Sequence, residues 1–215
     1  TFQGLVKRLI KELNNSQQEY MFTGALAVSY YGRPRTTTDI DIIIHTRPED
    51  INRLTGALRE AGLSFSEHRL KQSLESEYNI ITLEDKVSPY SVDCIFVRNS
   101  LDRRASTILG EPTFIQTPTD LILAKLSRIK ATRDRRKAYK DEEDIKSIIR
   151  NTHIEISELT VKTEKEDTLK ILEKFPNYRY TQDLILSSTL LPPHRGKVSS
   201  PRGTYPHPQI HPQYP

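Results

Sequence analysis

Asp39 and Asp41 lie in a run from Asp39 to Ile44 in which acidic residues are followed by apolar ones, Asp-Ile-Asp-Ile-Ile-Ile. This pattern is typical of a β-strand, whose side chains point to opposite faces in turn. Both carboxylates would share one face, and the other face would carry Ile40, Ile42 and Ile44. Neighbouring carboxylates repel each other, and a divalent cation bound between them would remove the repulsion. The run therefore predicts an acidic strand face that is suited to a metal ion.

Two further features extend this prediction. Asp93 interrupts another predicted strand, residues 90–97, that is otherwise fit for burial. The turn Thr23-Gly24-Ala25 precedes a short helix, and backbone N–H groups at a helix N-terminus favour phosphate. Three aspartates that converge from adjacent strands can hold two Mg²⁺ ions roughly 3.5–4 Å apart. Singly, each feature also fits a solvated strand face or an ordinary turn, but together they predict metal-assisted chemistry on phosphate.

The remaining pattern predicts the elements that would position these residues. Strands are expected at 20–22, 39–44, 78–83, 90–97 and 113–115, and helices at 2–14, 25–31, 46–62, 101–109, 118–130, 141–149 and 165–175. A basic connector is expected at 130–140. Strands and helices alternate, so we expect an α/β (α+β) fold with a small mixed β-sheet and flanking helices over 1–110. A helical C-terminal part over 111–176 and a disordered, Pro- and His-rich tail over 177–215 would follow.

The amino-acid composition excludes few classes of protein. The net charge of +4 favours a partner that carries phosphates, although a few surplus lysines also suit a solvated surface. The single cysteine, Cys94, allows no intrachain disulfide and fits a reducing compartment. No apolar run is long enough to span a bilayer. We therefore expect a cytoplasmic protein without a membrane partner.

Several of these motifs resemble one family. Gly24-Ala25 and the segment Tyr31 to Asp41 look like the first motif of the DNA polymerase beta-like nucleotidyltransferase superfamily, in the version of the abortive-infection-type enzymes. These include toxins of toxin–antitoxin pairs. Further matching segments are Val92-Asp93, Pro118 to Leu126 and Lys140 to Ile145. The resemblance covers about residues 20–150 and implies a nucleotidyltransferase core whose nucleotide site is completed by the C-terminal helices.

The resemblance also implies roles for individual residues. Asp39, Asp41 and Asp93 would be the catalytic and metal-binding carboxylates, and Gly24 and Ala25 would line the triphosphate. Lys125 would reach nucleotide phosphates, and Arg35 is a second candidate contact. Alternatively, Arg35 is a loop residue in solvent, Lys125 is a surface lysine, and Asp141 and Asp144 are helix-start charges. The family commonly has Gly-Ser or Gly-Gly in the turn, so Ala25 lacks a hydroxyl that Thr23 would partly replace.

The predicted activity is Mg²⁺-dependent transfer of a nucleoside monophosphate from a nucleoside triphosphate, such as ATP, to an acceptor hydroxyl. A tRNA end, a protein or a small molecule could carry that hydroxyl, and the basic residues 128–140 slightly favour RNA. The protein would be the toxin of a toxin–antitoxin pair, with an antitoxin as its partner. One rival reading is a catalytically inactive binding module, as an antitoxin or an RNA-binding partner. The other is an ordinary α/β domain with chance aspartates.

Overall fold

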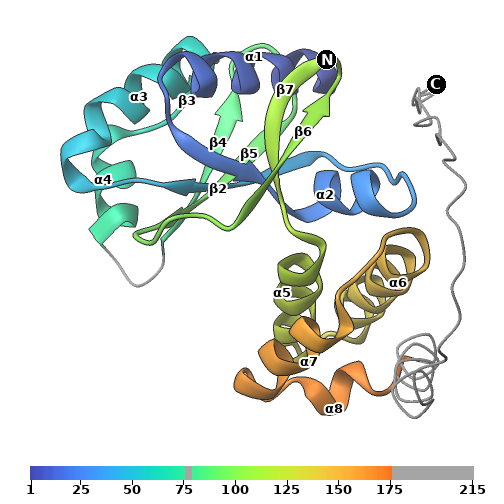
Figure 1. Cartoon of the computed structure of the whole chain (residues 1–215). Coiled ribbons are helices and arrows are strands. Elements are labelled where there is room, and N and C mark those ends of the chain that lie inside the picture. The colour runs from blue at the N-terminus through green and yellow to red at the C-terminus, as the bar shows by residue number, and fades with distance from the viewer. Residues whose placement is uncertain (76–78, 176–215) are drawn as a thin grey trace, which may run out of the picture.

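A seven-stranded mixed sheet forms the centre of the computed structural model, which describes residues 1–75 and 79–175. The strand order is β3-β4-β5-β2-β1-β7-β6 (Figure 1). The pairs β2–β5 and β1–β7 are parallel, and the other neighbours are antiparallel. The strands are β1 Glu19–Phe22, β2 Asp39–His45, β3 Leu63–Ser64, β4 Ile80–Asp85, β5 Ser91–Val97, β6 Arg103–Ile108 and β7 Glu111–Gln116.

Helices flank the sheet and form a separate C-terminal group. Figure 1 shows α1 and α3 running along the sheet and α5 to α8 gathered at one end, beside α2. None of the described helices is long and apolar enough to cross a membrane. The helices are α1 Phe2–Asn15, α2 Gly24–Tyr31, η1 Pro48–Asp50, α3 Ile51–Glu60, α4 Glu67–Glu75, α5 Pro118–Ala131, α6 Arg135–Asn151, α7 Ile156–Lys165 and α8 Leu169–Leu172.

Alternation along the central strands separates the core from the acidic face. One face of β2 and β5 is buried and consists of Ile40, Ile42, Ile44, Val92, Cys94 and Phe96. The apolar stripe of α1 belongs to the same core. Side chains alternate along a strand, so Asp39, Asp41 and Asp93 lie on the other face. This confirms the mixed sheet and the shared face predicted for Asp39 and Asp41.

The helix predicted at 101–109 is wrong, because this segment is strand β6. It forms a hairpin with β7 through Leu109 and Gly110, whose φ angles are +53° and +84°. Two-residue hairpin turns favour positive φ at both positions. Gly110 adopts this conformation easily, but leucine is unusual there, so the sequence lacks the Asn-Gly signal of such turns. The sheet consequently extends to Gln116, and the predicted domain boundary at residue 110 falls inside this hairpin.

Two predicted helical segments have different bounds in the structure. The connector predicted at 130–140 is mostly helical, because α5 ends at Ala131 and α6 begins at Arg135, where the side chain of Asp134 caps the helix. The helix predicted at 165–175 is instead the end of α7 followed by the short α8. The predicted tail over 177–215 lies outside the described residues.

Arg8 of α1 joins this helix to the edge of the sheet. Its Nη2 donates to Asp85 Oδ1 at 2.6 Å, and its Nε donates to the Ala61 carbonyl at 2.9 Å. Burial by itself raises the pKa of Asp85. The hydrogen bonds from Ser88 and Arg8 and the Arg8 charge outweigh this effect, so the pKa lies below its ordinary value.

This depressed pKa predicts a pH-dependent contribution to stability. The ionised Asp85 stabilises the fold above its unfolded pKa of about 4, and the contribution is lost as pH falls through the folded value. Asp85→Asn should lower the free energy of unfolding by about 1–3 kcal/mol at neutral pH, and the difference from wild type should shrink near pH ~3. Urea denaturation at both pH values measures this. An equal difference at both would contradict a role for the Asp85 charge.

Candidate active site

Three carboxylates lie together on the open face of β2 and β5. Asp41 and Asp93 are directly opposite in the parallel pair, and Asp39 is opposite Ser91. Neighbouring strands are about 4.8 Å apart, so Asp41 and Asp93 are close neighbours. Hydroxyls hold two of the carboxylates: Ser91 donates to Asp39 Oδ1 at 3.0 Å, and Thr82 donates to Asp93 Oδ1 at 2.6 Å. The structure thus brings together the three aspartates that the sequence predicts.

The ionised form of Asp41 is unfavourable in this position, as its raised pKa shows. Burial is the largest effect and raises the pKa of Asp41, and the charges of Asp93 and Asp39 raise it further. The Ala25 backbone N–H and the charge of Arg128 act in the opposite direction without cancelling the rise. None of the three aspartates forms an ion pair with any residue in 1–75 or 79–175. The face therefore carries negative charge that a bound cation would compensate.

These donors fit Mg²⁺ by their chemistry, because hard divalent cations prefer carboxylate oxygens. The hydroxyl contacts of Asp39 and Asp93 each use Oδ1 and leave the second oxygen for another partner. In the part of the chain that the structure describes, no three His, Cys, Asp or Glu side chains are already arranged around one ion position. The metal assignment consequently rests on the uncompensated carboxylates and stays a prediction.

The turn before α2 is built around Asp41. Gly24 has a φ of +60°, and a Cβ atom there would lie 1.8 Å from Asp41 Oδ2. The backbone N–H of Thr23 donates to the Asp41 carbonyl at 3.0 Å, which fixes the turn against β2. Positive φ is costly for residues with a side chain, and no side chain fits in this space. Gly24 is therefore required for the observed position of the Asp41 carboxylate.

The neighbours of Gly24 contact protein groups in this structure. The Thr23 hydroxyl donates to Gln116 Oε1, and both side chains are buried. The Ala25 backbone N–H is directed at the Asp41 carboxylate. In this structure the turn positions a catalytic candidate, and the proton of the Thr23 hydroxyl is used in its bond to Gln116. Phosphate contacts by Thr23, Gly24 and Ala25 stay a prediction.

A Gly24→Ala variant should lose both stability and activity. The added methyl group strains the turn and displaces Asp41, which should cost about 1–3 kcal/mol in free energy of unfolding. Nucleotidyl transfer should fall by about 100-fold, because a misplaced carboxylate no longer meets the substrate. Gly56→Ala is the matched control, since Gly56 lies in α3 with no atom within 4 Å of an added Cβ. It should be neutral or slightly stabilising in thermal denaturation, and equal effects of the two substitutions would contradict the argument.

Lys125 lies in a buried charged cluster between α5 and α6. Its Nζ is 3.1 Å from Asp141 Oδ1 and 2.8 Å from Asp144 Oδ2, and the lysine is 2% exposed. Both aspartates are buried in the interior of α6, which begins at Arg135. The alternatives of a surface lysine and of helix-start aspartates are therefore wrong. Contact between Lys125 and a nucleotide stays a prediction.

Two arginines extend this cluster. Arg35 Nη2 is 3.4 Å from Asp144 Oδ2, and Arg128 Nε is 3.3 Å from Asp141 Oδ2. The Arg35 side chain is mostly buried, and its Nε has no hydrogen-bond partner within the described residues. The Arg128 side chain is 61% exposed, and its charge acts on Asp41. The sequence placed Arg128 only in a basic stretch, but the structure brings its charge close enough to act on Asp41.

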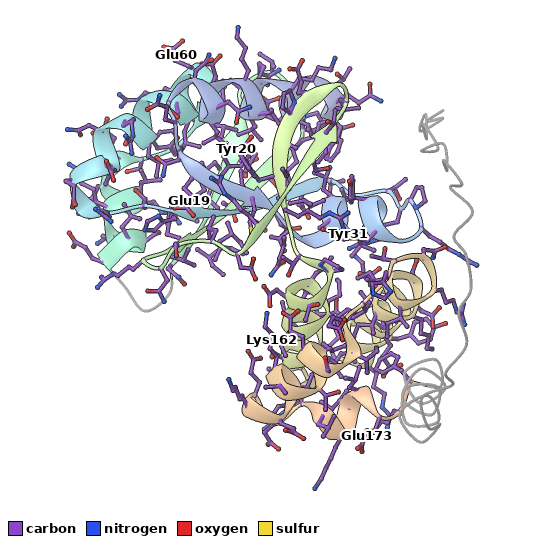
Figure 2. The ribbon with its side chains drawn as sticks, viewed as in Figure 1. Glu19, Tyr20, Tyr31, Glu60, Lys162 and Glu173 are labelled. Atoms are coloured by element: carbon purple, nitrogen blue, oxygen red, sulfur yellow. The ribbon has the colours of Figure 1, made fainter. Side chains whose placement is uncertain are left out.

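Tyr31 joins α2 to both the sheet and the helical part (Figure 2). Its hydroxyl donates to the Gln116 carbonyl at 2.9 Å, and its carbonyl accepts from Thr152 Oγ1 at 2.7 Å. The Arg33 backbone N–H also donates to Ser147 Oγ at 2.7 Å. Burial raises the pKa of Tyr31 to about 12, so its hydroxyl keeps its proton at neutral pH. These bonds fix the charged cluster relative to the aspartates.

Two solved structures show the same fold. The crystal structure of ANT(2″)-Ia in complex with adenylyl-2″-tobramycin matches with a TM-score of 0.56 and 12% identity, covering 77% of this chain and 97% of that chain. An antigenic nucleotidyltransferase-like protein from Paracoccidioides brasiliensis matches with a TM-score of 0.50 and 18% identity, covering 80% and 92%. No curated protein matches this sequence.

The family assignment comes from the sequence itself. Residues 8–189 match the family described as "Nucleotidyl transferase AbiEii toxin, Type IV TA system". The match spans most of the chain and includes every residue of the acidic face and of the charged cluster. The fold agrees with this match, and the protein is a nucleotidyltransferase. The chain therefore belongs to the AbiEii nucleotidyl transferase toxin family.

Proposed function

We propose that this protein transfers a nucleoside monophosphate from a nucleoside triphosphate to an acceptor hydroxyl, with Mg²⁺ held by Asp39, Asp41 and Asp93. The observation that carries the proposal is the direct opposition of Asp41 and Asp93 on parallel strands, with Asp39 on the same face. The acceptor oxygen would form a bond to the α-phosphorus, and the bond from that phosphorus to pyrophosphate would break. The hydroxyl proton would pass to a carboxylate of this face or to water.

The protein's own residues would mainly position the reactants and compensate charge. When bound, two Mg²⁺ ions would supply positive charge to the phosphate and acceptor oxygens. Gly24 leaves room for the Asp41 carboxylate, and the charge of the exposed Arg128 side chain acts on that carboxylate. Arg35 contacts Asp144, and its buried Nε has no hydrogen-bond partner in the described part of the chain, which suits a phosphate contact after a modest movement. ATP is one candidate donor.

Family membership also supports a partner. We propose that the protein acts as the toxin of a pair and that an antitoxin binds it. Its acceptor would be an RNA such as tRNA, a protein or a small molecule, and the family match alone does not choose among them.

Labelled nucleoside triphosphates test the proposed reaction directly. The full chain is incubated with each α-labelled triphosphate, Mg²⁺ and host RNA, host protein or tobramycin. We expect Mg²⁺-dependent transfer of label to one acceptor and none with EDTA. Absence of transfer to every acceptor would contradict the proposal.

Calorimetry separates the enzyme from the inactive binding module. A catalytic site should bind a non-hydrolysable triphosphate only with Mg²⁺, and Asp41→Ala should abolish that binding. RNA binding that needs no metal and is unaffected by Asp41→Ala would instead support the binding module.

A further inference from the structure

A groove runs between α4 and β4, beside the acidic face. It has a volume of about 490 Å³, within the range of small-molecule sites. Its lining combines one exposed apolar side chain with hydroxyl, amide and charged groups: Arg69, Gln72, Ser73, Ile80, Ile81, Thr82 and Glu84. None of these residues has a part in the site described above, apart from the contact of Thr82 with Asp93.

Thr82 connects this groove to the carboxylates. It lines the groove, is opposite Asp93 in the β4–β5 pair and donates a 2.6 Å hydrogen bond to Asp93 Oδ1. Ile80 and Glu84 are two residues away on either side and therefore share its strand face. Three of the four β4 residues that line the groove thus lie on the same sheet face as Asp41 and Asp93, one strand beyond Asp93, and Ile81 is on the other face.

The groove and the Gly24 turn lie on opposite sides of the β2–β5 pair. Gly24 follows β1, on one side of β2, whereas β4 lies on the far side of β5. Across neighbouring strands, the Gly24 turn, Asp41, Asp93 and Thr82 therefore follow one another in this order. In phosphoryl-type transfer, the attacking and leaving oxygens lie roughly in line on opposite sides of phosphorus. A triphosphate held on the side of Gly24 and Arg128 would leave the Thr82 side to the acceptor.

The lining indicates the chemistry of that acceptor. Ile80 is 56% exposed and offers an apolar surface to the carbon face of a ring. Around it, Gln72, Arg69 and Glu84 offer an amide, a guanidinium and a carboxylate for hydroxyl groups. Neither Arg69 nor Glu84 is in an ion pair within the described residues. A guanidinium on one wall and a carboxylate on the other suit a ring whose hydroxyls both donate and accept hydrogen bonds better than a phosphate chain, which only accepts.

We propose that this groove binds the sugar ring that carries the acceptor hydroxyl, and that Thr82 holds Asp93 toward it. The proposal rests on the proposed function for its reaction: the sugar oxygen bonds to the α-phosphorus, pyrophosphate leaves, and the hydroxyl proton passes to Asp93 or water. The sugar could be the terminal ribose of an RNA or the ring of an amino sugar. Both sources share this chemistry, and the test separates them.

Thiol protection detects occupancy of the groove without any need for turnover. The only cysteine, Cys94, is fully buried and its thiol pKa is raised by burial, so it reacts slowly. Gln72→Cys places one reactive thiol on the groove wall, and Lys71→Cys is the matched control on the same helix outside the lining. The probes are an RNA oligonucleotide, its periodate-oxidised form with an opened terminal ribose, and tobramycin.

At ten times its dissociation constant, a ligand that fills the groove should slow maleimide labelling of Gln72→Cys about tenfold. Lys71→Cys should be unaffected. Protection by intact but not oxidised RNA identifies terminal ribose, and protection by tobramycin identifies an amino sugar. Protection by neither sugar probe overturns the proposal, whether or not label is transferred. Protection without transfer to any acceptor supports the sugar site and counts only against the proposed reaction.

Kinetics supply a second readout. Ile80→Ala should raise the KM for the labelled acceptor about fivefold, with the KM for the triphosphate unchanged. Val87→Ala is the matched control, because Val87 is an exposed aliphatic residue in the β4–β5 turn, outside the groove. An unchanged acceptor KM in Ile80→Ala, or a raised triphosphate KM, would contradict the assignment.

Discussion

Asp93→Asn is expected to stabilise the metal-free protein while it abolishes most of the activity. Asp93 is opposite Asp41, and its charge helps to raise the pKa of Asp41. Removing one of two neighbouring like charges should add about 1 kcal/mol to the free energy of unfolding. Asparagine keeps the shape and the oxygen that accepts from Thr82, so packing should not change. Transfer should nevertheless fall about 100- to 1,000-fold, because the Mg²⁺ that would compensate the phosphate charge loses one of its carboxylate ligands.

With saturating Mg²⁺, the wild type should become more stable than Asp93→Asn. A ligand that binds only the folded state raises its stability, so saturating Mg²⁺ should raise the melting temperature of the wild type. Asp93→Asn should gain little, because a bound ion would lose one carboxylate. Thermal denaturation with Mg²⁺ and with EDTA measures both effects. A variant that is less stable than wild type in EDTA, or equally stabilised by Mg²⁺, would contradict a functional carboxylate pair.

Glu60→Gln is the matched control for loss of one negative charge. Glu60 is exposed at the end of α3, away from the acidic face (Figure 2). This substitution should leave both the activity and the Mg²⁺ response unchanged. If it changed either one, the effects of Asp93→Asn would reflect net charge instead of the paired site.

The acidic face was predictable because it depends on local alternation. Ile40, Ile42 and Ile44 mark the buried side of β2, so the side of Asp39 and Asp41 follows. Strand register is not local, and the pairing of Thr82 with Asp93 depends on how β4 aligns with β5. Strand β6 was not predicted either, because its turn into β7 contains Leu109 in a conformation that leucine rarely adopts.

The sequence also contains a pattern that indicates the charged cluster. Lys125 is flanked in α5 by Leu121, Ile122 and Leu126, and Asp141 and Asp144 precede Ile145 and Ile148 on the buried stripe of α6. Opposite charges within two apolar stripes indicate helices that bury an ion pair between them. The acidic run Asp141 to Asp144 instead suggested a helix start, because acidic residues commonly occupy first turns. The effect of Arg128 on Asp41 could not be predicted, because it depends on how α5 packs against the sheet.

Lys125→Met is expected to produce the largest loss of stability. It would leave Asp141 and Asp144 buried without their shared cation, and breaking a buried pair in this way costs about 3–5 kcal/mol. Arg128 and Arg35 lie farther from these carboxylates and are more exposed, so they should compensate only in part. Urea denaturation measures the loss. Lys130→Met is the matched control on the same helix, because the Lys130–Asp167 pair is exposed and screened by solvent, so its loss should change the free energy of unfolding far less.

Replacing the two aspartates that pair with Lys125 separates the effect of this lysine on stability from its effect on nucleotide binding. Lys125→Met combined with Asp141→Asn and Asp144→Asn leaves no unpaired buried carboxylate, so most of the lost stability should return. Lys125 has three donors, of which two are directed at Asp141 and Asp144, and the third could meet a phosphate. Calorimetry on the triple variant decides this point. Triphosphate affinity that is lost in the triple variant but kept in Asp141→Asn/Asp144→Asn would establish the contact that the resemblance implies. Unchanged affinity in the triple variant would limit Lys125 to stabilising the packing of α5 against α6.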